Sequence, residues 1–288
     1  MALGLNKTKR RIASVRSTQK ITKAMGMVAT VKLKRFKDAH FASEGYFASL
    51  EEAMGRCFAF LDGKQKSPYL EEKKDAKGDL IIFLTSDLGL CAAYNSNLFR
   101  YLDEVIDKEN DSVIALGGKG LSHLLHEGGY RLEEASEYGL SLGSTPREIE
   151  ASSKKLQQAF LDGKYRSIKV IYTHYVNSLS FLPQEYALLP VSLDYKKKED
   201  EDWCPPIFEP SAKEQGELLM GQYLSGVLTC LLNESQLSEQ ASRRNAMDAA
   251  NDNADELLKQ LSVEYNKARQ SSITQEITEV VAGASNAR

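Results

Sequence analysis

Residues 211–288 read SAKEQGELLMGQYLSGVLTCLLNESQLSEQASRRNAMDAANDNADELLKQLSVEYNKARQSSITQEITEVVAGASNAR. The stretch contains no proline, and apolar or small residues recur three and four positions apart from Leu218 to Ala241 and again from Leu257 to Val281. This spacing places them on one stripe of a helix. A continuous helix over most of the stretch would be on the order of 100 Å long, more than the diameter of a globule of this size. We therefore expect a rod that needs a partner, and the other end of the chain is the nearest candidate.

The N-terminal segment, from about Leu5 to Leu61, is also typical of a long helix. Its apolar side chains fall on a broad arc: Ile12, Val15, Ile21, Met25, Val28, Leu33 and Phe36. The small residues Ala24, Gly26 and Ala29 interrupt a strict heptad and would let a second helix approach closely.

The two ends of the chain are complementary in charge. Eleven Lys or Arg residues lie between Lys7 and Lys37, and no acidic residue precedes Asp38. From Ser211 onward, acidic residues outnumber basic ones by eleven to seven. Charge and helical pattern together predict that the two ends pair.

The middle of the chain changes its period. All seven prolines lie between Pro68 and Pro210, so we divide the chain into an N-terminal helix at 1–67, a globular domain at 68–210 and a C-terminal helix at 211–288. Strands are predicted at 79–85, 112–116, 168–176 and 180–191, and helices near 98–106, 121–126 and 144–160. Residues 196–202 predict a solvated linker. The predicted fold class is α/β plus long helices: an antiparallel two-helix coiled coil formed by the terminal segments, with a small Rossmann-like α/β domain of mainly parallel strands between them.

Several functional classes find little support in the sequence. The sequence contains no run of about 18 apolar residues, so no transmembrane helix is predicted. The first thirty residues lack the apolar core of a secretory signal. The four cysteines are widely separated, which favours reduced thiols over a metal site. We expect no catalytic, cofactor-binding or metal-binding residue.

Two loops of the middle domain still require a choice. The run Gly117-Gly118-Lys119-Gly120 follows a strand and opens a helix, where a phosphate could bind, but it matches neither dinucleotide-binding nor P-loop spacing. A tight turn is the favoured interpretation. Ser86, Asp87 and Cys91 include possible nucleophiles, yet nothing in the sequence places a base beside them.

The basic N-terminal helix leaves two kinds of partner open. Its bases occur on nearly all sides and alternate with apolar residues that need burial, which favours contact with protein. A basic coiled-coil protein that binds nucleic acid remains the alternative.

Three segments add a family resemblance. Residues 12–35 read IASVRSTQKITKAMGMVATVKLKR, residues 263–287 read VEYNKARQSSITQEITEVVAGASNA, and residues 85–98 read TSDLGLCAAYNSNL. The first two are similar to the most distinctive stretches of the γ subunit of the rotary F-type ATP synthase, and the third resembles that family's (S/T)DRGLCGGxN loop. The segments occur in the family's order and span nearly the whole chain.

The resemblance implies a non-catalytic rotor, present in one copy per complex. In this family the paired helices form the central shaft inside a hexamer of alternating α and β subunits (F1), and ATP is made on β. The α/β domain forms the foot, against the ε subunit and the membrane-embedded c-ring. The implied location is the cytoplasmic face of a bacterial cell membrane, as a peripheral subunit.

The resemblance also implies contacts with the β subunits, although some of the same residues could simply hold the two helices together. The implied contact residues are Lys20, Ile21, Thr22, Lys23, Met25, Cys91, Arg243, Gln270, Thr274 and Glu276. Lys20 and Lys23, with Lys32, Lys34 and Arg35, would face an acidic loop of β.

This chain departs from the family pattern in the loop and in the N-terminal helix. Leu88 replaces the loop arginine, and Ala92 and Ala93 replace paired glycines, which predicts a stiffer turn without a basic contact. Gly26 would cost up to about 1 kcal/mol of helix propensity at an exposed site.

Overall fold

The computed structural model describes residues 2–59, 67–73, 75–76, 78–191, 207–209 and 211–285. The chain divides into two compact units. Unit 1 consists of Met1–Thr30 and Arg243–Arg288, and unit 2 consists of Val31–Ser242. Two helices contribute to both units, α1 (Ala2–Ala59) and α6 (Ala212–Ser285). The predicted linker at 196–202 lies outside the described residues. The domain boundaries 1–67, 68–210 and 211–288 remain a prediction.

Unit 1 is a helical pair with heptad geometry. On α1 eight shielded positions follow one another in steps of three and four: Leu5, Thr8, Ile12, Val15, Gln19, Thr22, Gly26 and Ala29. On α6 the matching positions are Met247, Asn251, Ala254, Leu258, Leu261, Tyr265, Ala268 and Ser272. The sequence predicted that a strict heptad of apolar residues is interrupted. In the structure the shielded positions, called the seam of the pair, keep heptad spacing, but polar residues and glycine occupy some of them.

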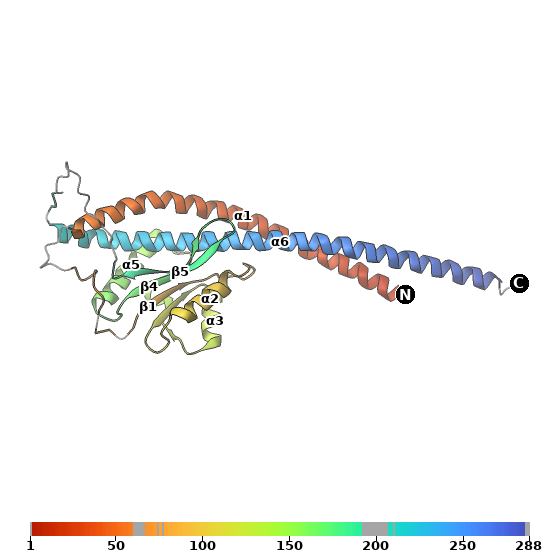
Figure 1. The fold of residues 1–288 in the computed structure, drawn as a ribbon, viewed down its shortest axis with the longest axis horizontal. Coiled ribbons are helices and arrows are strands. Elements are labelled where there is room, and N and C mark those ends of the chain that lie inside the picture. The colour runs from red at the N-terminus through yellow and green to blue at the C-terminus, as the bar shows by residue number, and fades with distance from the viewer. Residues whose placement is uncertain are drawn as a thin grey trace. The chain divides into compact units, whose positions relative to one another are not determined.

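Two hydrogen bonds between the helices define the register of this pair. The Thr22 hydroxyl donates to the side-chain oxygen of Asn251 at 2.6 Å, and the Gln19 amide donates to Asp255 at 2.7 Å. Residue numbers fall along α1 as they rise along α6, so the two helices run antiparallel (Figure 1). The antiparallel pairing predicted from the sequence is confirmed.

Unit 2 contains a five-stranded sheet in the order β3-β2-β1-β4-β5. Its strands are β1 (Leu80–Leu84), β2 (Ser112–Leu116), β3 (Arg131–Leu132), β4 (Ile168–Tyr175) and β5 (Phe181–Leu189). The first four are parallel, and β5 returns antiparallel beside β4. The four predicted strands and the mainly parallel sheet are therefore confirmed, and only the short edge strand β3 was not predicted.

Helices cover both faces of this sheet (Figure 1). They are α2 (Tyr94–Val105), α3 (Gly118–Glu127), α4 (Ala135–Tyr138) and α5 (Pro146–Leu161). Alternate residues of β1 enter different cores, because successive side chains of a strand point to opposite faces. Ile82 belongs to the core that also contains residues of α1, α5 and α6, whereas Phe83 belongs to the core with α2 and α3. The start of α5 is fixed by a capping box between Thr145 and Glu148.

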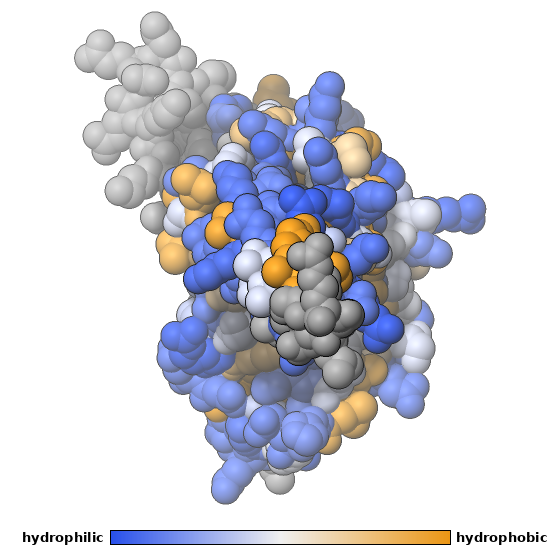
Figure 2. Space-filling view, turned by 90° about the vertical axis from the view of Figure 1, so that its right-hand side faces the viewer, coloured by the Kyte–Doolittle hydropathy of each residue, from blue (hydrophilic) through white to orange (hydrophobic). Residues whose placement is uncertain are grey.

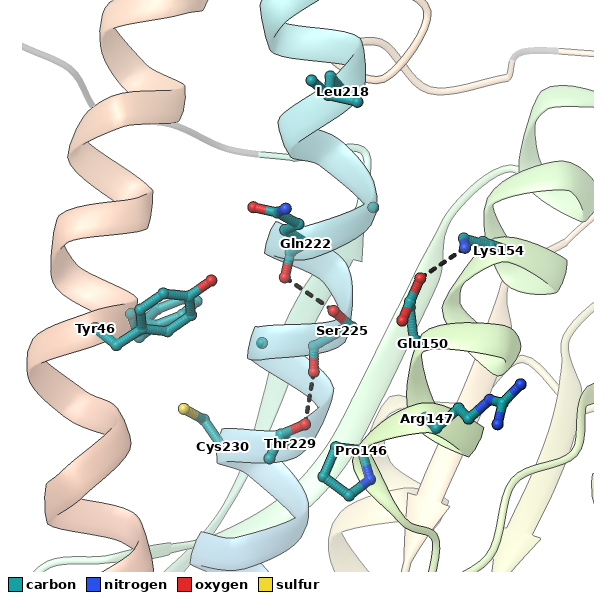
Figure 3. Close-up of a pocket in the computed structure, with 13 residues that line it drawn as sticks. Tyr46, Pro146, Arg147, Glu150, Lys154, Leu218, Gln222, Ser225, Thr229 and Cys230 are labelled. Carbon is teal, nitrogen blue, oxygen red and sulfur yellow. Dashed lines mark hydrogen bonds and ion pairs between the residues drawn. The ribbon is translucent and has the colours of Figure 1, made fainter.

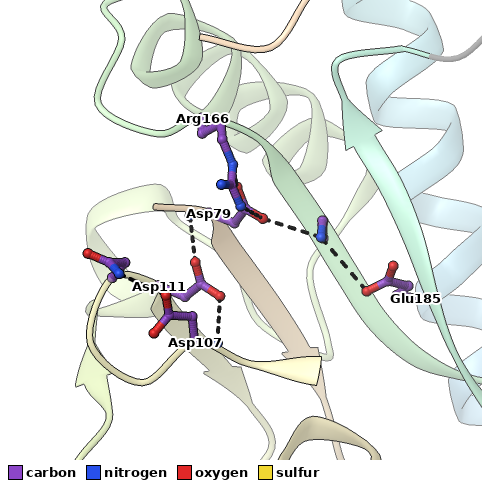
Figure 4. Close-up of polar contacts among 7 residues, drawn as sticks. Asp79, Asp107, Asp111, Arg166 and Glu185 are labelled. Carbon is purple, nitrogen blue, oxygen red and sulfur yellow. Dashed lines mark hydrogen bonds and ion pairs between the residues drawn. The ribbon is translucent and has the colours of Figure 1, made fainter. Parts of the chain in front are cut away.

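A buried carboxylate stabilises the amino-terminal edge of the sheet (Figure 4). Both oxygens of Asp79 accept hydrogen bonds from Arg166 at 2.9 Å, and Lys169 lies 3.2 Å away. The Asp79 backbone N–H donates to Asp111 at 2.8 Å. Burial alone would raise the pKa of Asp79, but the hydrogen bonds from Arg166 and the positive charge of Lys169 outweigh it and lower the pKa below its ordinary value.

No helix among the described residues is long and apolar enough to cross a membrane.

Candidate partner interface

The α1 surface of unit 1 carries a basic stripe. Arg16, Lys20 and Lys23 are exposed and lie four and three positions apart, which places them on one side of the helix. Two nearby acidic residues of α6 have other contacts: Asp248 pairs with Arg244 at 3.6 Å, and Asp255 accepts from Gln19. The stripe therefore keeps a positive surface that an acidic partner could approach.

Apolar side chains lie on the same helix without cover. Ile21 is 58% exposed, Met27 60% and Val28 57%. Ile21 and Val28 are seven positions apart and so share one side of α1. Exposed aliphatic side chains beside charged ones are the usual composition of a surface that binds another protein.

The end of α6 carries a second apolar surface. Every described side chain from Ile273 to Val281 is exposed, because the antiparallel register places these residues beyond the start of α1. Ile273, Ile277, Val280 and Val281 recur at helical spacing and are 47% to 71% exposed. Figure 2, a view from the right-hand side of Figure 1, shows a group of hydrophobic residues near its centre with mostly hydrophilic ones further out. A lone helix with such a stripe requires a partner to bury it.

The predicted contact residues fall into three groups in this structure. Six are exposed in unit 1: Lys20, Ile21, Lys23, Gln270, Thr274 and Glu276. Thr22 and Met25 are half-buried, and Thr22 bonds across the pair to Asn251. Arg243 and Cys91 are buried, at 7% and 2% exposure. Whether these residues contact a partner stays a prediction.

Gly26 has the role in close helix packing that the sequence predicted for the small residues of this helix. The residue is buried, and a Cβ atom built there would lie 3.3 Å from Cβ of Met247. The close approach of the two helices therefore depends on the missing side chain.

The Cys91 loop in unit 2 is held by hydrogen bonds. The thiol accepts from the Asn95 amide at 3.3 Å, and the Cys91 carbonyl accepts from the Ser242 hydroxyl at 2.7 Å. The Ser86 hydroxyl donates to the Leu88 carbonyl at 2.7 Å. A carbonyl cannot take up the proton that a serine nucleophile must lose, so this geometry does not activate Ser86.

Two exposed leucines project from this loop. Leu88 is 68% exposed and Leu90 is 63% exposed. Leu90 and Ala92 both adopt positive φ, 62° and 47°, in the region that favours glycine. The prediction of a stiffer turn thus gains a physical basis at Ala92, while Ala93 has an ordinary φ of −84°.

The glycine-rich turn before α3 is filled by the protein's own atoms. The N–H of Gly118 donates to Asp87, and the N–H of Gly120 donates to the Thr85 hydroxyl at 2.9 Å. Gly117 adopts a φ of 109°, and a Cβ there would lie 2.5 Å from the Thr85 carbonyl. The backbone donors that a phosphate would need are engaged, which supports the tight turn.

An open groove of about 660 Å³ lies in unit 2 among α1, α5 and α6 (Figure 3). The hydroxyls that α6 contributes are turned toward their own helix: Ser225 donates to the Gln222 carbonyl and Thr229 to the Ser225 carbonyl. Glu150 and Lys154 pair at 2.6 Å on the α5 side. These four side chains are engaged within their own helices, so they offer no evident chemistry to a ligand. Across the described part of the chain, no group of three His, Cys, Asp or Glu side chains could hold a metal ion.

These features define a class of protein: an antiparallel helical pair with unburied apolar and basic surfaces, joined to a small α/β domain. A family model described as ATP synthase matches residues 4–286. The ATP synthase gamma chain of Mycoplasma mobile is 37% identical, over 97% of this chain and 98% of its own length. The gamma chain of Clostridium perfringens is 35% identical, over 98% of this chain and 97% of its own length.

Solved structures agree with the fold. The rotor of Euglena gracilis mitochondrial ATP synthase is 17% identical, with a TM-score of 0.65 over 95% of this chain and all of that one. The central stalk of the Tetrahymena thermophila mitochondrial enzyme is 22% identical, with a TM-score of 0.56 over 80% of this chain and 99% of its own. The chain belongs to the family of ATP synthase gamma chains, and the family resemblance stated from the sequence is confirmed.

Proposed function

We propose that this chain is the central rotor stalk of an ATP synthase, which transmits ion-driven rotation of the c-ring to the catalytic β subunits. The observation that carries the proposal is the surface of unit 1: a helical pair that leaves Ile21, Val28, Ile277 and Val281 uncovered and carries exposed bases on α1. Family membership supplies the partner that would cover them, a hexamer of α and β subunits.

The mechanism follows from symmetry. One asymmetric helical pair cannot contact three equivalent β subunits in the same way, so each β subunit experiences a different contact free energy and favours a different conformation. Rotation of the pair would pass these preferences from one β subunit to the next. A shift of one site from almost fully open to almost fully closed requires contacts that differ by roughly 5 kcal/mol.

The same proposal makes the chain a non-catalytic subunit. Ser86, one nucleophile candidate of the α/β domain, donates its hydroxyl to a carbonyl, and the N–H groups of Gly118 and Gly120 at the start of α3 are engaged by protein oxygens. ATP chemistry would take place on β, with the protein peripheral at the cytoplasmic face of the membrane through the c-ring and the ε subunit. The coupled ion is a proton or a sodium ion.

The contacts with β would centre on the exposed stripe of unit 1. Lys20 and Lys23 would attract the acidic loop of β, and Gln270, Thr274 and Glu276 lie exposed near the end of α6 where they could bond to the hexamer. Thr22, Met25, Arg243 and Cys91 are at least half-buried, so they would act by shaping the helices and loop that present the exposed residues.

Rotation of an assembled complex tests this function. The purified chain is mixed with the α and β subunits of the same organism, the hexamer is fixed to a surface, and a rod is attached to the chain. We expect a stable complex in which ATP drives stepwise rotation. A chain that instead binds DNA at physiological salt and forms no hexamer complex would favour the alternative function, which the comparisons do not support.

A further inference from the structure

The stretch of α6 from Glu234 to Ser242 is buried although it is rich in polar residues. Six of its polar side chains are at most 8% exposed: Glu234, Ser235, Ser238, Glu239, Gln240 and Ser242. A buried polar group is costly unless it is hydrogen-bonded. The partners of these side chains therefore show what the burial achieves.

Two of these side chains join α6 to β4 through three contacts. The Glu234 carboxylate lies 2.6 Å from Nδ1 of His174 and accepts the backbone N–H of Tyr175 at 3.1 Å. One helical turn later, the Ser238 hydroxyl donates to the Thr173 carbonyl at 3.1 Å. These contacts involve consecutive residues of one strand, so they fix the position of α6 along that strand.

Further contacts join the same stretch to three other parts of unit 2. The Ser235 hydroxyl lies 2.8 Å from the hydroxyl of Tyr94, at the start of α2. The Gln236 amide donates to the Leu142 carbonyl, before α5, and Ser242 donates to the Cys91 carbonyl, after β1. We call Glu234, Ser235, Gln236, Ser238 and Ser242, with these partners, the polar joint.

Contacts with α1 at the same level are of another kind. Leu237 and Ala241 are fully buried and pack with Leu33 of α1, with Phe36 and Phe181 beside them. Apolar contact is non-directional, so it resists separation more than it resists sliding or twisting. Hydrogen bonds depend on distance and angle, and a turn of the helix about its axis would leave several buried polar groups unsatisfied together.

We infer that the polar joint locks α6 to the α/β domain against twisting, so that torque passes between the domain and the long helix without slip. Its members are positioning residues, since they act through the helix. This inference rests on the proposed rotor function and adds to it the residues that carry the load inside the subunit.

The test compares two sets of substitutions on the same helix. The joint variant carries Ser235→Ala, Ser238→Ala and Ser242→Ala. The control variant carries Ser225→Ala and Thr229→Ala, whose hydroxyls bond only to carbonyls of α6 itself. Both sets remove hydroxyls and retain the helix, but only the first removes bonds to other elements.

The complete synthase is studied in inside-out vesicles, by the amount of ion pumped per ATP hydrolysed. Proton uptake is followed with a pH-sensitive dye and sodium uptake with a radioactive tracer. We expect the joint variant to hydrolyse ATP but pump less ion per ATP, and the control to match the wild-type ratio. An unchanged ratio in an assembled joint variant would overturn the inference. A wild-type complex that never couples hydrolysis to pumping would instead overturn the rotor function.

Assembly of the joint variant is checked by subunit composition and thermal unfolding. If the triple variant does not assemble, Gln236→Met serves instead, because it removes one bond to Leu142 and keeps the length of the side chain. Torsional stiffness between a label on the α/β domain and a label on α6 provides the second readout. We expect it to fall in Gln236→Met, and a stiffness equal to that of the wild type would contradict the joint.

Discussion

Thr22 of α1 and Asn251 of α6 form a hydrogen bond of 2.6 Å inside the seam of the helical pair. Both positions belong to the heptad series in which apolar residues are usual. A polar contact in a seam favours one register over its neighbours, because a shift of either helix leaves the group without its partner. We infer that this bond, with that of Gln19 to Asp255, holds the antiparallel register.

Removal of the Thr22 hydroxyl tests that contribution. We expect Thr22→Val to lower the free energy of unfolding by about 1 kcal/mol, since it leaves the side-chain oxygen of Asn251 without its donor. Thr30→Val is the control, because the Thr30 hydroxyl donates to the Gly26 carbonyl of its own helix. Urea unfolding followed by circular dichroism measures both. Equal losses in the two variants would mean that the bond across the pair contributes nothing.

Gly26 leads to a second prediction. Gly26→Ala should be nearly neutral, because about 1 kcal/mol of helix propensity is gained while the contact with Met247 must lengthen by a few tenths of an ångström. Gly26→Leu should destabilise the pair by about 1–3 kcal/mol, since the larger side chain has no space. Thermal unfolding of the two variants decides the matter. A stable Gly26→Leu protein would show that the helices do not need their close approach.

The Cys91 loop permits a paired test of backbone strain. Ala92 has a φ of 47°, so Ala92→Gly should relieve strain and stabilise the protein by roughly 0.5–1 kcal/mol after the entropy of the unfolded chain is subtracted. Ala93 has an ordinary φ of −84°, so Ala93→Gly should only destabilise. Chemical unfolding of both variants reveals the sign. Two changes of the same sign would argue against strain at Ala92.

Asp79 predicts how stability depends on pH. Its pKa is lowered in the folded protein, so the carboxylate contributes stability above the ordinary value of 3.8, and this is lost as the pH falls through the lowered pKa. At pH 7 we expect Asp79→Asn to cost about 1–3 kcal/mol, because the buried site loses its charged hydrogen bonds to Arg166. The difference in the free energy of unfolding between the wild type and Asp79→Asn should decrease toward pH 3.

Urea unfolding at pH 7, 5 and 3 measures the difference in stability between the wild type and Asp79→Asn. Glu150→Gln is the control, since Glu150 pairs with Lys154 at the surface and the exchange should have a small effect at each pH. A gap between wild type and Asp79→Asn that stays constant over the whole range would show that ionisation of Asp79 does not stabilise the fold.

Much of the fold was predictable because long patterns determine it. The apolar period of residues 211–288 predicted α6 within a few residues, and the apolar run at 79–85 predicted the buried strand β1. The edge strand β3 was missed because its two residues, Arg131 and Leu132, are exposed and form no apolar run. A two-residue strand exists only through its neighbour, which a local pattern cannot reveal.

The polar contact between Thr22 and Asn251 in the helical pair and the polar joint were not predicted, for a related reason. Thr22 and Ser238 look like residues of a solvated helix face, and only the packed structure shows Asn251 and the Thr173 carbonyl beside them. Arg243 was expected at an interface and is buried at 7% exposure, which sequence type alone would not suggest for arginine. The exposed stripe with Lys20 and Lys23 was accessible from the sequence, because charge and helical spacing define it.

Lys23 offers the most direct test of that stripe. The side chain is exposed on α1, so Lys23→Glu should not disturb the helical pair, yet it should repel an acidic loop of β and lower ATP synthesis in reconstituted vesicles. Lys23→Arg keeps the charge and should retain synthesis, and Lys23→Gln should lie between them. Because salt screens exposed charges, the difference in ATP synthesis between Lys23→Arg and Lys23→Glu should decrease as ionic strength rises. Equal synthesis by all three variants, in complexes of normal subunit composition, would remove Lys23 from the coupling contact.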